Sequence, residues 1–354
     1  MVWAGLALLI GVALVVRLLY QPPEDAHERM HAQEAAAQAT IDALAELPPE
    51  QQLRALESHL SLQSPIAVRT AAVEAIARID APKARALLRE ALRDFASPVR
   101  VRVAETATRQ PRKHALELLI DCLADHDTDV RQSAIIGIQR IGDSRAVSAL
   151  IDILRDDPNE QTQQMAMGAL RALTKQPFYA RYTDPPAQRQ EARQAWLRWW
   201  ATAQDQIASL RPKPVHPTHT QEAPDLTLRT LDGESIALRR PPKLLLLNFW
   251  GTWCGGCQAE LPHLIALHQR YADRVLVLGI AFDEPEGVQG LRRFCTEKGI
   301  RYPQVLGDER TRDAFDISGV PQTVLLDTQG RIRFWWVGTR DAGTLERALQ
   351  LLLQ

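Results

Sequence analysis

Residues 244–262 read LLLLNFWGTWCGGCQAELP, and they join an apolar run, a pair of cysteines and an amphipathic stretch. Lys243 to Trp250 has the composition of a strand that is buried on both faces of a sheet. Cys254 and Cys257 follow at once, and apolar side chains then recur at roughly helical spacing as far as Tyr271. A Cys-x-x-Cys motif between a strand and a helix is the setting in which this motif indicates thiol-disulfide chemistry.

The two cysteines are expected to play different chemical parts. The start of a helix stabilises negative charge, so we expect the pKa of the Cys254 thiol to be lowered and its reactive thiolate to be populated. Cys257 lies one turn further along, where it would be more shielded and could resolve a mixed disulfide by attacking Cys254. The alternative is half of a zinc site, which lacks a second cysteine pair, because Cys122 and Cys295 stand alone. We interpret Cys122 as a small buried hydrophobic residue and Cys295 as a buried structural cysteine, with a third redox cysteine as the alternative for Cys295.

The rest of the C-terminal region alternates strands with helices and ends in a hairpin. Strands are expected at 274–282, 322–327 and 331–337, and helices near 254–271, 287–298, 309–315 and 341–353. This order predicts an α/β fold whose sheet has mixed strand directions.

Residues 222–354 resemble the thioredoxin fold, in particular the membrane-tethered TlpA/ResA-type thiol-disulfide oxidoreductases. The resemblance rests on short stretches that span the whole domain: APDL at 223–226, LDG at 231–233, LNFWGTWC at 247–254, CQAELP at 257–262, GVPQT at 319–323 and LLD at 325–327. Two positions depart from the pattern. Asn248 replaces the buried aspartate of thioredoxins and cannot carry a proton, and Gly256 replaces a proline that many relatives have before the second cysteine.

The resemblance implies roles for four further residues. Pro321 would be cis and face the active disulfide, and the backbone of Val320 would pair with an extended substrate segment. Glu260 would assist proton transfer, and Trp253 would cover the disulfide and contact the substrate. The alternatives are a solvated helix residue for Glu260 and a packing residue for Trp253. The cysteine pair carries the electrons, so no metal or organic cofactor is expected.

A repeat of 31 residues precedes this domain. Val-Arg pairs recur at 68–69, 99–100 and 130–131, and a degenerate copy follows at 161–162. Each unit predicts two amphipathic helices, which can bury their apolar faces only by stacking on neighbouring units. The pattern resembles the HEAT-like repeats of bacterial proteins over roughly residues 50–175, and this resemblance implies a protein partner.

The remaining landmarks divide the chain into domains. We expect an all-α HEAT-like solenoid over 24–205, sealed at its end by Trp196, Trp199 and Trp200, and a proline-rich linker over 206–221. The thioredoxin-like domain follows over 222–354. His114 and His126 are interpreted as surface residues of the solenoid.

The first 20 residues have the composition of a transmembrane anchor. Val2 to Val16 are apolar or glycine without interruption, and Arg17 can extend its charge toward the headgroups. No small-x-small cleavage site follows, which favours an uncleaved anchor over a signal peptide. Taken literally, Arg17 after the run would place the body of the protein in the cytoplasm. The family resemblance favours the periplasm, and we adopt that topology.

Composition and motifs together predict a function. The 42 basic and 43 acidic residues give a net charge of −1, which does not favour nucleic-acid binding. We expect a single-pass protein of the bacterial cytoplasmic (inner) membrane whose periplasmic domain exchanges disulfides with exported proteins, while the HEAT-like domain recruits a protein partner. The resemblance further implies a membrane electron donor and apocytochrome substrates, as in cytochrome c maturation. The alternatives are a HEAT scaffold whose thioredoxin-like domain only binds partners and, with less support, a peroxidase, which does not need a Cys-x-x-Cys pair.

Overall fold

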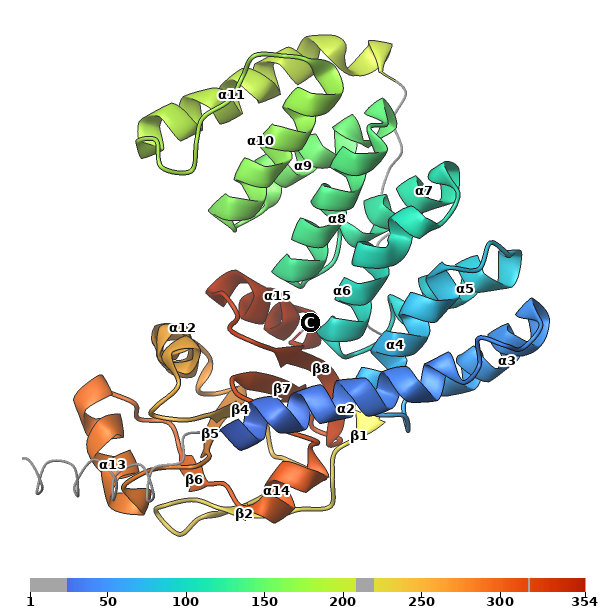
Figure 1. The fold of residues 1–354 in the computed structure, drawn as a ribbon. Coiled ribbons are helices and arrows are strands. Elements are labelled where there is room, and N and C mark those ends of the chain that lie inside the picture. The colour runs from blue at the N-terminus through green and yellow to red at the C-terminus, as the bar shows by residue number, and fades with distance from the viewer. Residues whose placement is uncertain (1–23, 208–219, 318, 354) are drawn as a thin grey trace, which may run out of the picture.

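The computed structural model describes residues 24–207, 220–317 and 319–353, which form a helical solenoid and an α/β domain that lie against each other (Figure 1). The expected membrane anchor over residues 1–20 lies outside the described residues. Within the described ranges, every helix is too short or too polar to cross a bilayer.

The solenoid consists of paired helices whose starts repeat the period of the sequence. α4, α6 and α8 begin at Ile66, Ser97 and Thr128, which are 31 residues apart. The helices are α2 (Glu24–Asp42), α3 (Pro49–His59), α4 (Ile66–Ala77), α5 (Pro82–Ala91), α6 (Ser97–Thr106), α7 (Arg112–Cys122), α8 (Thr128–Ile141), α9 (Val147–Asp156), α10 (Glu160–Thr174) and α11 (Pro186–Ala203). Short 3-10 turns lie at Ala107–Arg109, Ser144–Ala146 and Gln204–Gln206.

The arginine of each Val-Arg pair explains why this dipeptide recurs. It is buried inside the solenoid and forms a two-pronged ion pair with an aspartate ahead of the next repeat. The pairs are Arg69 with Asp94, Arg100 with Asp125 and Arg131 with Asp157, with shortest N–O distances of 2.7, 2.9 and 2.6 Å. A buried guanidinium needs such a partner, so each repeat retains both charges.

The tryptophan-rich segment closes the far end of the solenoid, as predicted. Trp196 and Trp200 of α11 are buried, and the Trp196 indole nitrogen donates a hydrogen bond of 2.8 Å to the carbonyl oxygen of Phe178. The rings of Phe178 and Trp199 pack edge-on against Trp196. These aromatic contacts cover the apolar face that the last repeat would otherwise expose.

The α/β domain has a six-stranded sheet of mixed direction, in the order β1-β8-β7-β4-β5-β6. β4, β5 and β6 are parallel, whereas β7, β8 and β1 join by antiparallel pairing. Its strands are β1 (Gln221–Glu222), β4 (Leu244–Trp250), β5 (Val275–Ala281), β6 (Gln304–Leu306), β7 (Gln322–Leu326) and β8 (Arg331–Val337), and β2 (Thr227–Arg229) pairs with β3 (Ser235–Ala237) in a separate ribbon. The helices are α12 (Gly255–Tyr271), α13 (Gly287–Lys298), α14 (Glu309–Ala314) and α15 (Ala342–Leu352).

The sheet separates two apolar cores. Alternate residues of β4 point to opposite faces, so Leu244 and Leu246 pack with the residues of α12 and α15, while Leu245 and Leu247 belong to a core that continues into the solenoid. Trp335 and Trp336 of β8 likewise lie on opposite faces, as predicted, and both are buried.

The solenoid docks directly onto β8 and the segment that follows it. The amide nitrogen of Trp335 donates to the carbonyl oxygen of Phe95 at 3.0 Å, and the two rings stack with centroids 6.2 Å apart. His126, which we expected at the surface, is instead buried in this contact with its ring 6.1 Å from that of Phe334. Phe95 and His126 occupy equivalent positions of successive repeats, so the α/β domain rests on one edge of the solenoid.

A second set of interdomain contacts is polar. Arg340 forms ion pairs with Asp127 and Asp129 of the solenoid at 3.2 and 2.7 Å. The Thr128 hydroxyl donates to the Asp341 carboxylate at 2.7 Å. The proline-rich linker therefore connects two domains that already bind each other through apolar and charged contacts.

Candidate active site

The two cysteines of the motif are joined in a disulfide at the start of α12. Cys254 is the residue that caps this helix, and its sulfur accepts the amide hydrogen of Cys257 at an N–S distance of 3.1 Å. Cys254 is 8% exposed and Cys257 is 1% exposed. The first sulfur is thus the more accessible one, and it receives both the helix-terminal amide and the favourable end of the helix dipole, as the nucleophile of an exchange reaction requires.

A loop with a cis peptide bond lies opposite the disulfide. The bond between Val320 and Pro321 is cis, as the resemblance implies. The carbonyl oxygen of Val320 is 3.8 Å from the Cys254 sulfur, and the Val320 side chain is half-buried. The backbone of this loop therefore lies beside the bond that an incoming thiolate would attack.

Gly256 faces this loop at close range. A Cβ atom at Gly256 would lie 2.9 Å from the Thr339 hydroxyl and 3.7 Å from the Pro321 ring. That same hydroxyl donates a hydrogen bond of 3.2 Å to the carbonyl oxygen of Gly256. The absence of a side chain between the cysteines is therefore matched to Thr339, which occupies the space a larger residue would need.

Trp253 lies half-buried beside the disulfide. Its indole nitrogen donates to the carbonyl oxygen of Phe282 at 3.1 Å, and its ring packs against the core that contains both cysteines. The ring approaches Gly251 so closely that a Cβ there would be 2.6 Å from the indole nitrogen. Trp253 is thus held in a fixed position one residue before Cys254.

Glu260 is fully buried, so the alternative of a solvated helix residue is wrong. One carboxylate oxygen accepts the backbone amide of Arg340 at 3.0 Å, and the other accepts the side-chain amide of Asn248 at 3.1 Å. Burial raises the pKa of Glu260 to about 7, although Arg340 and Asn248 both act to lower it. A carboxyl group one turn from Cys257 can therefore hold or release a proton near neutral pH.

Three residues of this site were not found from the sequence as site residues. Arg340 supplies the backbone amide to Glu260, and Asn248, noted only as a departure from the family, orients the same carboxyl while donating to Thr323 at 3.2 Å. Glu284 accepts the Thr252 amide at 2.9 Å and its hydroxyl at 2.6 Å, which fixes the turn before Cys254. Arg340 and Glu284 lie in no recognisable sequence motif, because each reaches the site only through contacts with residues far away in the sequence.

The thiols of the other two cysteines are buried and have raised pKa values. Cys295 is buried in α13 and its burial raises the thiol pKa to about 11. Cys122 is buried in the solenoid, where its pKa is raised well above the ordinary value for the same reason. Among the residues that the structure describes, no three His, Cys, Asp or Glu side chains form a cluster that could hold a metal ion.

A central sheet with a disulfide at a helix start, opposite a cis-proline loop, defines a thioredoxin-like redox domain. Comparison with known proteins gives the same class. The AhpC/TSA family matches residues 219–335, and HEAT repeats match residues 86–171. The chain is 33% identical to the thioredoxin-like protein YneN of Bacillus subtilis over 133 residues, which are 37% of this chain and 78% of YneN.

Two further relatives extend the comparison. The thiol-disulfide oxidoreductase ResA of Halalkalibacterium halodurans is 32% identical over 135 residues, which are 37% of this chain and 76% of ResA. The crystal structure of a thiol:disulfide interchange protein from Chlorobium tepidum is 25% identical in sequence. The alignment covers 39% of this chain and 99% of that chain, with a TM-score of 0.35. The chain belongs to the family of thioredoxin-like thiol-disulfide oxidoreductases, and it carries this domain fused behind HEAT repeats.

Proposed function

We propose that this enzyme exchanges disulfides with exported proteins while anchored by residues 1–20 to the bacterial cytoplasmic membrane, with both folded domains in the periplasm. The observation that carries the redox step is the Cys254–Cys257 disulfide, in which the more exposed sulfur lies beside the Val320 carbonyl. A single pass by residues 1–20 agrees with the apolar composition of that segment, and a periplasmic site agrees with a disulfide-forming motif, which an oxidising compartment favours.

Reduction of a substrate starts from the dithiol form of the enzyme. The Cys254 thiolate attacks one sulfur of the substrate disulfide, so that a Cys254–substrate bond forms, the substrate S–S bond breaks and the leaving thiolate takes up a proton. The Cys257 thiol then loses its proton and attacks the Cys254 sulfur. The enzyme disulfide forms, the second substrate thiol leaves, and two electrons and two protons have passed to the substrate. The same steps in reverse oxidise a substrate dithiol.

The surrounding residues serve these steps by position. Glu260 takes the proton of Cys257 in the second step, because its pKa of about 7 matches a thiol that must ionise near neutral pH. Val320 and Pro321 hold the substrate backbone beside Cys254, and the half-buried Trp253 covers the disulfide and contacts the substrate. A dithiol donor of the membrane would restore the reduced enzyme, and apocytochromes of the cytochrome c maturation pathway are one class of substrate to test. The HEAT-like domain would recruit a protein partner.

The redox proposal is tested with the full chain in mild detergent. The pre-reduced protein should reduce a small aromatic disulfide, and Cys254→Ala should abolish this reaction, whereas Cys122→Ala in the solenoid should not. Equal rates for the wild-type protein and Cys254→Ala would leave a scaffold that only binds partners.

The substrate class is tested in cells. Cys257→Ala should accumulate mixed disulfides with exported proteins, because the resolving thiol is missing. Recovery of no protein beyond that of a variant lacking both cysteines would contradict the proposed role in exchange with exported proteins. Labelling of an engineered exposed cysteine, for example at Ala36 of α2, by a membrane-impermeant reagent in intact spheroplasts should report a periplasmic domain.

A further inference from the structure

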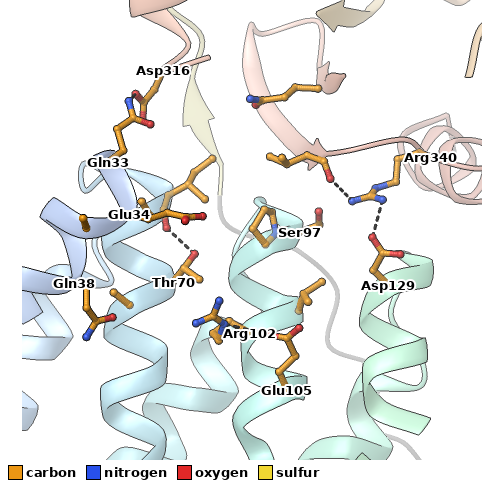
Figure 2. Close-up of a pocket in the computed structure, with 18 residues that line it drawn as sticks. Gln33, Glu34, Gln38, Thr70, Ser97, Arg102, Glu105, Asp129, Asp316 and Arg340 are labelled. Carbon is orange, nitrogen blue, oxygen red and sulfur yellow. Dashed lines mark hydrogen bonds and ion pairs between the residues drawn. The ribbon is translucent and has the colours of Figure 1, made fainter. Parts of the chain in front are cut away.

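A cavity of about 720 Å³ lies where the solenoid meets the redox domain, and we call it the interdomain groove (Figure 2). Helices α2, α4 and α6 form one wall, and the ends of β7 and β8 with Arg340 form the other. Its apolar surface includes Ala35, Ile66, Ala67, Pro98, Val101 and Val337.

The groove begins next to the redox centre. Gln322, which lines it, directly follows the cis-proline Pro321, and Val337 pairs with Gln322 across the two strands. Arg340, at the far wall, gives its backbone amide to Glu260. The groove therefore lies within one residue of the cis-proline loop and within one hydrogen bond of Glu260.

The groove also offers backbone-like hydrogen-bonding groups. The amide of Trp335 points away from β7 to reach Phe95, so the amide of Val337, two residues later on the same strand, points to the same side of β8. The Val337 side chain is 37% exposed. Beside it, the buried hydroxyl of Ser97 lines the groove and has no hydrogen-bond partner among the described residues.

Charge around the groove favours a cationic occupant. The carboxylates that line it are Glu34, Glu105, Asp129 and Asp316. Two guanidinium groups face them, and both are engaged in ion pairs: Arg102 with Glu74 and Glu105, and Arg340 with Asp127 and Asp129. These ion pairs also engage Glu105 and Asp129, so the groove is lined by four carboxylates and two guanidinium groups together with apolar side chains.

We propose that the interdomain groove binds an extended segment of the substrate polypeptide, apolar in character and bearing a lysine or arginine, that flanks the cysteine undergoing exchange. The solenoid then forms part of the substrate-binding surface and selects among disulfides. This inference rests on the proposed function, because it concerns the substrate of the same disulfide.

The test uses two versions of one short peptide and a pair of adjacent alanines on α2. Both alanines are exposed, but Ala35 lines the groove and Ala36 does not, so tryptophan at each position is a matched pair. The probe is a valine-rich peptide with one lysine and one cysteine, the cysteine held as a mixed disulfide with an aromatic thiol. Pre-reduced full-length protein, freed of reductant, reacts in a single turnover that releases the coloured thiol.

Ala35→Trp should lower the second-order rate constant for the peptide roughly tenfold, because the indole ring fills space in which an apolar side chain of the peptide would pack, while Ala36→Trp leaves it unchanged. Both variants should reduce a small aromatic disulfide at the wild-type rate. An equal decrease on both substrates, or no decrease on the peptide, would overturn the groove proposal. Failure of the wild-type protein to reduce even the small disulfide would instead contradict the proposed function.

The charge preference is tested by the peptide and by the protein. The wild-type protein should react faster with the lysine peptide than with its glutamate counterpart, and Asp316→Asn should reduce this preference. Asparagine tolerates the left-handed backbone of Asp316, whose φ is 49°, and Asp313→Asn, outside the groove, is the control. No difference between the two peptides would contradict a cationic segment.

Faster reaction after removal of residues 1–23 would mean that this segment occupies the groove and would also overturn the proposal.

Discussion

At the scale of single residues, the proton affinity of Glu260 is set by opposing effects. Removal of the carboxylate from water disfavours its charge, whereas the Arg340 amide, the Arg340 guanidinium and the Asn248 amide favour it. Burial outweighs the donors, so the carboxyl group binds its proton more tightly in the folded protein than in the unfolded chain. The raised pKa suits Glu260 to proton exchange, but it also means that folding at high pH must bury a charged carboxylate, which lowers the stability of the protein.

Glu260→Gln should therefore change how stability depends on pH. The pKa of Glu260 rises from 4.5 to about 7 on folding, so the wild-type protein loses stability as pH rises through this window. We expect the variant to gain roughly 3 kcal/mol relative to the wild-type protein between about pH 5 and about pH 8. Urea unfolding of both proteins at the two pH values measures this, and a difference that is independent of pH would contradict a buried, high-pKa carboxyl group.

Gly256 and its neighbour Gly255 should respond differently to the same change. Gly256→Ala brings a methyl group 2.9 Å from the Thr339 hydroxyl, whereas nothing lies within 4 Å of a Cβ at Gly255. We expect Gly256→Ala to cost about 1–3 kcal/mol by overpacking and Gly255→Ala to cost less than that. Thr339→Ala should restore most of the stability of Gly256→Ala. Equal effects of the two alanines in thermal or urea unfolding would rule out this steric account.

At the scale of elements, consecutive repeats of the solenoid are joined to one another by a ladder of buried arginine–aspartate pairs. Each arginine on the first helix of a repeat reaches an aspartate ahead of the next repeat, so the bonds run between consecutive units. The energetic role of such a pair is asymmetric, because removal of one partner leaves an isolated buried charge.

Arg100→Met should strongly destabilise the protein, because Asp125 would remain buried without its partner. The expected decrease in stability is about 3–5 kcal/mol, whereas Arg54→Met, at an exposed pair with Glu50, should cost at most about 1 kcal/mol. Urea unfolding of the two variants makes the comparison. Similar small effects would indicate that the ladder accompanies the repeat without stabilising it.

Much of this element structure could be predicted from periodicity. The 31-residue spacing located the paired helices, and the apolar runs located β4, β5, β7 and β8 to within a residue or two. β1, β2, β3 and β6 were not predicted, because two or three residues are too few to show alternation. The aspartate partners of the ladder were also missed, since nothing in the local sequence links Arg100 to Asp125.

In the candidate site, too, the residues marked by local motifs were predicted and those placed by tertiary contacts were not. The motif and the family resemblance identified Cys254, Cys257, Pro321 and Val320 as neighbours, and the structure brings them together. The environment of Glu260 could not be foreseen, because its depth depends on how the segment after β8 packs over α12.

At the scale of the whole molecule, Arg340 connects the two domains to the redox site. Its side chain is paired with Asp127 and Asp129 of the solenoid, and its backbone amide holds Glu260. The residue is only 6% exposed. The docking of the solenoid and the placement of the buried carboxyl group therefore depend on the same residue.

Arg340→Met should loosen this docking. It leaves Asp127 buried without its cation, at an expected cost of about 3–5 kcal/mol. We expect faster proteolysis within the linker over 206–221 and an altered pH dependence of disulfide reduction. Arg239→Met, at an exposed pair with Glu222, is the control. Unchanged proteolysis together with an unchanged pH profile would show that apolar packing around Phe95 and Trp335 suffices to hold the domains.

The edge-on docking of the solenoid has an evolutionary consequence. The redox domain touches the units that begin at α6 and α8, and the groove uses those at α4 and α6, while α10 and α11 lie at the far end (Figure 1). Units inserted or deleted beyond α8 would lengthen or shorten the free arm of the molecule while the neighbourhood of the sulfurs stayed the same. Duplication of one 31-residue unit between α4 and α8 would instead separate the units that contact the redox domain together, so the three units from α4 to α8 are not interchangeable parts.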